Sequence, residues 1–366
     1  MREGWEYKKL GDLCDIYQPK TLATEQLVAD GKYYVYGANG IIGRYNDYNH
    51  EQSEILLTCR GATCGTINIS QPYSWINGNA MVIHRKSEDL SFDFLKYLML
   101  SLDYSLIITG AAQPQITRQK IAPILVKYPS LSVQQSIVSE LDKINELIRL
   151  KKEQLKDYDN LAQSIFYEMF GDPVVNEKGW GIKKLGNFCE IGTGSTPSRK
   201  NKEYYEGSIS WVKSTEVSNC VIDSTEEHIS EIAIAETNCT IYPKGTILIA
   251  MYGQGKTRGQ IAILNIEATT NQAVAAILPS ELCDKLFLYY CLHLMYENIR
   301  SMARGGNQAN LNLAIVRSIN IILPPLPLQQ TFAQRIELIE RQKAEIQSTI
   351  ADLETLLASR MQYWFD

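Results

Sequence analysis

The strongest pattern in this chain of 366 residues is a heptad repeat of apolar positions, and it occurs twice. Apolar residues step by four and three along 137–169 and again along 332–364, at an offset of 195 residues. This spacing keeps one face of an α-helix apolar over roughly five heptads, as in the seam of a coiled coil. The first seam consists of Ile137, Leu141, Ile144, Ile148, Lys151, Leu155, Tyr158, Ala162, Ile165 and Met169, and the second of Phe332, Ile336, Ile339, Lys343, Ile346, Ile350, Leu353, Leu357, Arg360 and Trp364.

The two predicted helices should pair with each other, because a helix that carried such a seam alone would expose it to water. The two seams repeat in the same order from the N-terminus to the C-terminus, and a globular segment lies between them in the sequence. An antiparallel pair, with its halves related by a pseudo-twofold, satisfies both conditions. Ordinary core packing is the alternative explanation of heptads, but two long matched seams in one chain favour a rigid spacer.

The segments before each helix contain short strand-like runs between Gly/Asn turns. Each segment also contains one longer apolar stretch that predicts a buried helix. The strand-like runs include 54–58, 66–69, 80–84 and 247–252, and the buried helices are predicted at 92–106 and 287–302. We therefore predict an α/β or α+β fold, in which two similar globular domains are joined by two long helices that form an antiparallel coiled coil.

The globular segments also repeat each other directly. Residues 5–16 read WEYKKLGDLCDI and residues 180–191 read WGIKKLGNFCEI, with seven identical positions out of twelve. A second match joins 124–137 to 319–332. The offset grows from 175 to 195 residues between the two matches, so the second copy holds 20 additional residues. Two copies of so large a unit are not a solenoid; they predict a protein that meets a roughly twofold partner.

The distribution of charge permits DNA binding without requiring it. The net charge of the whole chain is −5, and this excess lies in the helical segments: 131–172 carries a net −3 and 326–366 a net −2. Segments 1–130 and 173–325 are each neutral, so they can present local basic faces to phosphate groups.

Other features of the composition predict a cytoplasmic globular protein. The eight cysteines form no CxxC pair and the four histidines form no cluster, so we expect reduced structural thiols and no metal site. The first residues lack the apolar run of a signal peptide, and no stretch reaches about 18 apolar residues, so no membrane span is expected.

The motif AMYGQGKT at 250–257 matches a loose phosphate-loop pattern, with Ala in place of the first Gly. A phosphate loop must lead into a helix whose N-terminus holds the phosphates. Here RGQIAILN follows, which alternates like a strand. We therefore predict a strand–turn–strand with Lys256 and Arg258 at its tip, with Arg60 as the counterpart in the first copy, and no nucleotide or other cofactor site.

Polar turns supply the candidate DNA contacts. Asn and Gln can bind adenine edges and Arg can bind guanine edges, whereas Ser and Lys suit phosphate groups. In the first globular segment the candidates are Asn39, Arg44, Arg60, Gln113, Gln115 and Arg118. In the second they are Ser198, Arg199, Lys200, Lys202, Lys213, Lys256, Arg258, Arg304, Asn307 and Gln308. Each is also an ordinary turn or surface residue, so only the set as a whole supports the hypothesis.

Catalytic motifs are missing from the sequence. It contains no DPPY-like or NPPY-like tetrapeptide of base methylases, and no GxSxG or HExxH. No catalytic residue is predicted. His293 lies in an apolar helix and is interpreted as a core residue.

Together these motifs resemble the specificity subunit of type I restriction-modification enzymes. The resemblance rests on the WxxxxLGxxC-type openings, GTGSTPS at 192–198, YGANGIIGRY at 36–45, PxLxxQQ at 129–135 and 324–330, and the helix after each, in the order of that family. It implies a target recognition domain at 1–130, a spacer helix at 131–172, a second target recognition domain at 173–325 and a second spacer helix at 326–366.

The resemblance also implies a non-catalytic DNA reader. Each globular domain would bind one half of a bipartite site in double-stranded DNA, and the helices would set the gap and dock two methyltransferase subunits. Those subunits would bring S-adenosylmethionine, and two restriction subunits would use ATP and Mg to translocate and cleave. The candidate docking residues are Gln134, Gln135, Gln329 and Gln330, together with the exposed helix faces.

Two other classes stay open from the residues alone. One is a nucleotide-dependent or methyl-transferring enzyme that acts by itself, and the missing motifs argue against it. The other is a scaffold whose globular domains bind protein. Binding of ATP or S-adenosylmethionine by the isolated chain would identify the first class, and selection from random DNA with the methyltransferase subunit present would separate the second from a DNA reader.

Overall fold

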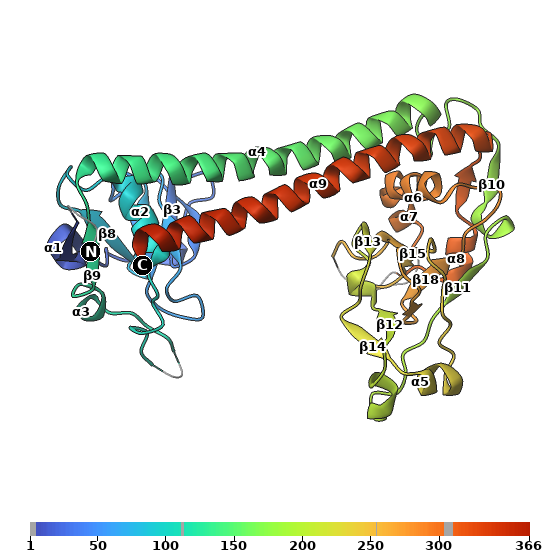
Figure 1. Cartoon of the computed structure of the whole chain (residues 1–366), viewed down its shortest axis with the longest axis horizontal. Coiled ribbons are helices and arrows are strands. Elements are labelled where there is room, and N and C mark those ends of the chain that lie inside the picture. The colour runs from blue at the N-terminus through green and yellow to red at the C-terminus, as the bar shows by residue number, and fades with distance from the viewer. Residues whose placement is uncertain (1–4, 111–112, 254, 304–309) are drawn as a thin grey trace. The chain divides into compact units, whose positions relative to one another are not determined.

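The computed structural model describes residues 5–110, 113–253, 255–303 and 310–366, and the chain divides into two compact units. Unit 1 consists of Met1–Lys152 and Ser348–Asp366, and unit 2 consists of Glu153–Gln347. Each unit therefore combines one globular part with a part of each long helix. Figure 1 shows the elements of both units, with the long helices labelled α4 and α9.

Unit 1 contains a four-stranded sheet in the order β2-β8-β5-β6 and a three-stranded sheet in the order β4-β3-β7, while β1 pairs with β9. Only the pairing of β3 with β7 is parallel among these described strands. The strands are β1 (Glu6–Lys9), β2 (Cys14–Tyr17), β3 (Tyr33–Gly37), β4 (Gly40–Tyr45), β5 (Ile55–Thr58), β6 (Ile67–Ile69), β7 (Trp75–Ile76), β8 (Ala80–Arg85) and β9 (Leu125–Tyr128). The helices are α1 (Leu10–Leu13), the 3-10 helix η1 (Thr24–Gln26), α2 (Phe92–Ser101) and α3 (Arg118–Ile121).

Unit 2 follows the same plan, with sheets in the orders β11-β18-β15-β16-β13 and β14-β12-β17 and a ribbon of β10 and β19. The strands are β10 (Ile182–Lys184), β11 (Ile191–Thr193), β12 (Ile209–Val212), β13 (Cys220–Ile222), β14 (Glu227–Ile229), β15 (Ile247–Ala250), β16 (Ile261–Leu264), β17 (Thr269–Thr270), β18 (Val274–Ile277) and β19 (Asn320–Ile322). The helices are η2 (Leu185–Asn187), η3 (Lys202–Tyr205), η4 (Ser214–Glu216), α5 (Glu231–Glu236), α6 (Lys285–Leu294), α7 (Tyr296–Ser301) and α8 (Leu313–Arg317). The predicted duplication is therefore present in the strand order, with β13 added beside β16.

Most of the additional residues of the second copy lie between β12 and β15. Tyr36 and Val212 hold the same place in the parallel pairs β3–β7 and β12–β17, at an offset of 176 residues. Ile55 and Ile247 each begin the central strand of the larger sheet, at an offset of 192 residues. The offset rises by 16 between these points, and this interval contains β13 and α5. Strand β13 lies between β12 and β14, where unit 1 has the tight turn between β3 and β4, and α5 lies between β14 and β15.

The central strand of each larger sheet is apolar because both of its faces are covered. In unit 1, Ile55 and Leu57 of β5 pack on the side of α2, whereas Leu56 between them packs on the side of the smaller sheet. All three side chains are fully buried. Strand β15 repeats this arrangement, with Ile249 toward α6 and Leu248 toward β12. Alternate residues of one strand therefore hold the helix and the second sheet together.

The long helices α4 (Leu131–Phe170) and α9 (Leu326–Phe365) pair in an antiparallel manner within each unit. In unit 1 the first part of α4 contacts the last part of α9, where Lys152 Nζ lies 2.8 Å from Glu354 Oε1. In unit 2 the last part of α4 contacts the first part of α9, where Lys343 Nζ lies 2.9 Å from Asp159 Oδ1. Every residue of both predicted seams is buried or half-buried. The predicted coiled coil and fold class are confirmed.

Both long helices end in aromatic residues that pack into a globular core. At the end of α4, the Phe170 ring centroid lies 4.8 Å from that of Phe287, the third residue of α6. At the end of α9, the Phe365 ring centroid lies 5.5 Å from that of Phe94, the third residue of α2. The heptad pattern did not include Phe170 or Phe365. These aromatic contacts attach the end of each helix to the core of one unit.

One predicted helix is interrupted in the structure, and another ends earlier than predicted. The segment 287–302 contains a break, because Met295 has ψ near 7° and separates α6 from α7. The segment 92–106 is helical only to Ser101, since Leu102 is extended. The predicted strand–turn–strand around 250–257 is confirmed, because β15 and β16 pair in an antiparallel manner and no helix follows the turn among the described residues there.

Candidate nucleic-acid interface

Three candidate DNA contacts of unit 1 gather around the turn that follows β5. Arg60 forms a β-bridge with Gln115, and Gln115 forms a second bridge with Thr109. Gln113 lies between the bridged residues along the chain. The Arg60, Gln113 and Gln115 side chains are exposed. Residues more than 50 positions apart in sequence therefore lie side by side on one exposed edge.

Asn39 lies on the turn between β3 and β4, next to the same loop. The Thr63 hydroxyl donates to Asn39 Oδ1, and Asn39 is exposed. Arg118 is exposed as well, at the first residue of α3. The structure thus brings Asn39 close to the loop that carries Arg60, a proximity that the sequence did not predict.

Arg44 has internal partners that its prediction as a DNA contact did not include. It is half-buried on β4, and its guanidinium donates to the Gly31 carbonyl at 3.2 Å and to the Tyr34 hydroxyl at 2.9 Å. The same group lies 4.4 Å from the centroid of the Tyr34 ring. Arg44 therefore contributes to the packing around the smaller sheet, and its contact with DNA stays a prediction.

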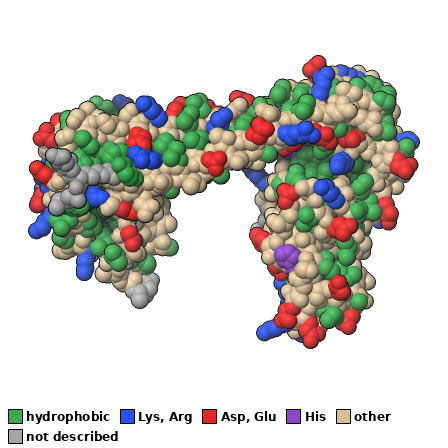
Figure 2. Space-filling model, viewed as in Figure 1, with side chains coloured by type: hydrophobic (Ala, Val, Ile, Leu, Met, Phe, Trp, Pro, Cys, Tyr) green, Lys and Arg blue, Asp and Glu red, His purple; other side chains and the backbone are tan. Residues whose placement is uncertain are grey.

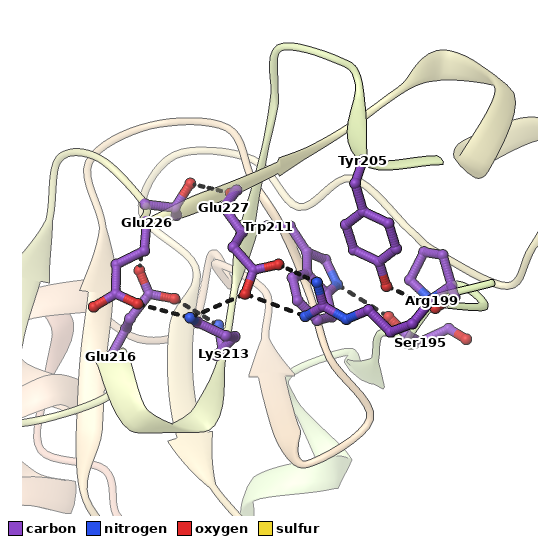
Figure 3. A network of polar contacts seen from close by, with 10 residues as sticks. Ser195, Arg199, Tyr205, Trp211, Lys213, Glu216, Glu226 and Glu227 are labelled. Atoms are coloured by element: carbon purple, nitrogen blue, oxygen red, sulfur yellow. Dashed lines mark hydrogen bonds and ion pairs between the residues drawn. The ribbon is translucent and has the colours of Figure 1, made fainter. Parts of the chain in front are cut away.

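In unit 2, the candidate Arg199 lies across two aromatic rings (Figure 3). Its guanidinium carbon is 4.2 Å from the centroid of the Tyr205 ring and 5.3 Å from that of the Trp211 ring. Tyr205 donates to the Pro197 carbonyl at 2.6 Å, which fixes the ring beside the loop 192–202. Arg199 is exposed although it is stacked in this way. The stacking therefore restricts the side chain to one position on the surface.

Acidic side chains compensate the charges of Arg199 and Lys213. Arg199 Nη2 lies 3.1 Å from Glu227 Oε1, and Lys213 Nζ lies 2.7 Å from Glu226 and 3.1 Å from Glu227. The hydrogen bond from Arg199 and that from Lys213 lower the pKa of Glu227, although partial burial opposes this. Glu216 accepts hydrogen bonds from the main-chain N–H groups of Lys213 and Glu226, at 2.8 and 3.0 Å. The result is a network of fixed cations, each paired with an acid (Figure 3).

Three other candidates of this loop are exposed as Arg199 is. Ser198, Lys200 and Lys202 are all exposed, and the Lys200 N–H donates to the Ser198 hydroxyl at 3.4 Å. Lys202 is the first residue of η3. Together with Arg199, this places four predicted residues on one short segment, where they can meet a phosphate group.

Lys256 and Arg258 lie on the turn between β15 and β16, as predicted. Lys256 is exposed and Arg258 is half-buried. Gly255 and Gly259 on either side have φ values of 62° and 85°, a conformation that favours glycine. The remaining candidates Arg304, Asn307 and Gln308 lie outside the described residues.

Two of the predicted docking residues have a different role. Gln134 is fully buried; its Oε1 accepts from the Ser91 N–H at 2.8 Å, and its Nε2 donates to the Pro129 carbonyl at 2.9 Å. Gln329 is buried in the same way and binds the Asp284 N–H and the Pro324 carbonyl, at 2.9 and 2.7 Å.

A partner at the surface cannot reach either of these amides. The prediction is therefore corrected for Gln134 and Gln329, which attach the start of each long helix to the start of α2 or α6. Gln135 and Gln330 are exposed and stay candidate docking residues.

Two kinds of site are absent from the described residues. In the part of the chain that the structure describes, no group of three or more His, Cys, Asp and Glu residues is placed to hold a metal ion. No helix there has the length and apolar content of a membrane span.

On the face in Figure 2, basic and acidic side chains are interspersed over each unit. Exposed Arg, Gln and Asn side chains on turns can bind base edges, and the lysines can bind phosphates.

Several residues of these sites were missed in the sequence. Glu226 and Glu227 hold the cations of unit 2, and Tyr205 and Trp211 support Arg199. Their only signal was a pair of acids and a few aromatic residues near a basic loop. On α7, Arg300 donates to main-chain carbonyls of the Gly255–Gly259 turn. No local pattern could have identified this contact, because the residues are about 45 positions apart.

Comparison with known proteins identifies the domain type. A family model described as the type I restriction modification DNA specificity domain matches residues 2–157 and 177–355. The type I restriction enzyme MjaIX specificity subunit of Methanocaldococcus jannaschii is 24% identical over 304 residues, which cover 77% of this chain and 70% of that protein. The EcoR124I/EcoR124II specificity subunit of Escherichia coli is 26% identical over 219 residues, which cover 57% of this chain and 52% of that protein. The matched part thus spans about half the length of the second relative.

Two solved structures have a similar fold. The type I restriction-modification S subunit from M. genitalium has a TM-score of 0.61 at 15% identity, covering 99% of this chain and 96% of that one. A chain from a structure on complex assembly and conformational transition of the type I R-M system has a TM-score of 0.62 at 18% identity, covering 99% and 97%. Both similarities extend over both units and both long helices.

Proposed function

We propose a function on one premise: the chain belongs to the type I restriction-modification DNA specificity family. We infer that it is the sequence-specificity subunit of such a system. Each globular part binds one half of a bipartite site in double-stranded DNA. The paired helices α4 and α9 set the spacing between the half-sites.

The observation that carries this proposal is the duplication of one binding domain within a single chain. The two sheets of each unit have corresponding strand orders, and the family match occurs once in each half. The loops differ between the copies, since the interval from β12 to β15 is longer in unit 2. Two similar scaffolds with different loops suit the reading of two different half-sites.

Partners would supply the chemistry. We propose that two methyltransferase subunits bind the chain, because it offers two similar surfaces at Gln135 and Gln330 and along the exposed helix faces. They would carry S-adenosylmethionine and methylate the target base. Two restriction subunits would use ATP and Mg. The chain itself would then be a non-catalytic subunit without a cofactor.

The test is methylation sequencing of the complex between this chain and the methyltransferase subunit of its own system. We expect a bipartite target. Arg258→Ala should relax one half-site by about 1–3 kcal/mol if Arg258 reads a guanine edge, and should only reduce the salt dependence of binding if it contacts phosphate. Equal loosening of both half-sites would contradict separate readers.

Two further measurements address the partners and the alternatives. Light scattering of the saturated complex should give two methyltransferase subunits per chain, and a stable one-to-one complex would contradict that stoichiometry. The isolated chain should bind neither ATP nor S-adenosylmethionine. Binding of either would favour an enzyme that acts alone, and a complex that fails to select any sequence from random DNA would favour a protein-binding scaffold.

A further inference from the structure

The turn between β15 and β16 is held by two side chains of α7. Arg300 Nη1 donates to the carbonyl of Gly255 at 2.8 Å and to that of Arg258 at 3.2 Å. The Tyr296 hydroxyl donates to the carbonyl of Lys256 at 2.6 Å and accepts from Arg300 Nη1 at 2.9 Å. One guanidinium and one phenol therefore bind three carbonyl groups of a turn of five residues.

The turn and α7 also fit each other closely in shape. Gly259 has a φ of 85°, and a Cβ atom added there would lie 3.0 Å from Arg300 Cγ. The Gly259 N–H donates to the Ala250 carbonyl at 2.8 Å, which closes the base of the turn. A larger residue at 259 would therefore push against Arg300 and strain the backbone at the same time.

These contacts orient the turn. Because the carbonyls of Gly255, Lys256 and Arg258 are bound by α7, the path of the main chain between them is restricted. The Lys256 side chain is exposed and that of Arg258 is half-buried. The side chains of Lys256 and Arg258 therefore extend from a main chain whose conformation is already restricted before any ligand binds.

Unit 1 attaches the corresponding turn by other means. There the Gly61 N–H donates to the Pro114 carbonyl at 3.0 Å, and the Gly65 N–H donates to the Thr58 carbonyl at 2.9 Å. Within the described residues, no helix lies between α2 and α3, whereas α7 lies between α6 and α8 in unit 2. The pair of Arg300 and Tyr296 is thus a feature of unit 2.

We propose that Arg300 and Tyr296 are positioning residues for the recognition of one DNA half-site. They hold the Gly255–Gly259 turn in the conformation in which Lys256 and Arg258 meet the DNA. This inference rests on the proposed function and adds two residues that need not touch the DNA themselves. A turn that is ordered in advance loses less conformational freedom on binding, and it places its side chains against a defined set of base edges.

The test compares Arg300→Met with the unaltered chain in the complex with the methyltransferase subunit. Methylation rates are measured on DNA libraries in which each position of both half-sites is varied. We expect Arg300→Met to lower the preference at one half-site by about tenfold, within the range for loss of a bidentate base contact. The other half-site should keep its preference.

Two further variants refine this test. Tyr296→Phe, which removes only the hydroxyl, should have a smaller effect on the half-site that Arg300→Met affects. Arg300→Lys should partly restore the preference because it can still bind a carbonyl.

The matched control is Arg317→Met. Arg317 is also an arginine of unit 2 whose guanidinium donates to a main-chain carbonyl, that of Ile191, at 2.7 Å. It contacts β11 and not the turn. This variant should change thermal stability without changing the preference at either half-site. Hydrogen exchange of peptides that cover 255–260 should be faster in Arg300→Met and unchanged in Arg317→Met.

Any of four results would overturn the inference. If Arg300→Met exchanges faster in the turn but keeps both preferences, the position of the turn does not determine recognition. If it lowers both preferences equally, or if Arg317→Met lowers the same preference as strongly, the effect is a general loss of structure. If the unaltered complex methylates without any sequence preference, the proposed function itself fails, whereas the attachment of the turn by Arg300 can still be measured by exchange.

Discussion

Glu140 and Arg360 form an ion pair that connects the start of α4 with the end of α9 in unit 1. Arg360 Nη2 lies 3.1 Å from Glu140 Oε2, and Trp364 Nε1 donates to the same oxygen at 3.0 Å. The hydrogen bond from Arg360 and that from Trp364 lower the pKa of Glu140, although partial burial opposes this. Residues 220 positions apart thus meet at one carboxylate.

This ion pair predicts a contribution to stability that depends on pH. A depressed pKa in the folded state stabilises the fold above the unfolded value of about 4.3, and the contribution is lost as the pH falls through the folded value. Glu140→Gln should therefore lower the free energy of unfolding by up to about 1 kcal/mol at pH 7, and the difference should shrink below about pH 4.3. Urea denaturation at a series of pH values measures it. Glu337→Gln, on an exposed position of α9, is the control and should have little effect. An equal loss in the control, or a difference that does not change in acid, would contradict the prediction.

The buried glutamines predict a second effect on stability. Gln134→Ala leaves the Ser91 N–H and the Pro129 carbonyl without this partner, and each such loss costs about 1–3 kcal/mol when the group stays buried. Gln329→Ala should have a similar effect in unit 2. The neighbours Gln135 and Gln330 are exposed, so Gln135→Ala and Gln330→Ala are controls that should change stability little.

The same glutamines provide a test of docking. Substitution of the exposed pair should weaken binding of the methyltransferase subunit, whereas substitution of the buried pair should not weaken it as long as the protein is folded. The reverse result would restore a docking role for Gln134 and Gln329.

The acidic partners of Arg199 and Lys213 predict a gain in non-specific DNA binding. Glu227→Gln removes the carboxylate that both cations contact. The charge of Arg199 then becomes available to phosphate, whereas Lys213 keeps its ion pair with Glu226 at 2.7 Å. We expect tighter binding to DNA without the target, and a salt dependence that steepens by about 0.9 for each cation that then reaches a phosphate. Titrations of the methyltransferase complex with such DNA at several salt concentrations measure both. Glu203→Gln changes the net charge by the same amount on the exposed start of η3. If it has the same effect, net charge alone explains the gain.

The helices predict a change in target spacing. One heptad inserted after Leu155 and one after Ile350 keep every seam residue on its face. The paired helices lengthen by about 10 Å, from seven residues at about 1.5 Å each. DNA advances about 3.4 Å per base pair, so the gap between the half-sites should grow by about three base pairs if the helices lie along the duplex.

The insertion should also reduce affinity at the best new spacing. Three base pairs rotate one half-site by roughly 100° relative to the other, at about 10.5 base pairs per turn. The half-site sequences should stay the same, because neither globular part is changed. Methylation sequencing of the complex shows both outcomes. An unchanged gap, or altered half-sites, would mean that the helices are not the spacer.

The sequence predicted the features of this chain that depend on local periodicity. A heptad seam can be identified without a structure, because the spacing of residues such as Ile137 and Leu141 alone determines which face of a helix is apolar. The duplication was also predicted correctly, because segments 5–16 and 180–191 match each other in sequence. The turn at Lys256 was predicted correctly because its residues and the flanking strands are neighbours in the chain. The division into target recognition domains and spacer helices by residue number stays a prediction.

Tertiary structure decided the features that depend on contacts between distant residues. The order of the strands, the burial of Gln134 and Gln329, and the pairing of Arg199 with Glu227 all join segments that no local pattern connects. Gln134 and Gln135 show the difference most directly. They are adjacent and chemically identical, and the sequence supported one role for both. Only the direction in which each side chain leaves the helix places Gln134 in the core and Gln135 on the surface, because adjacent helical residues point about 100° apart around the helix axis.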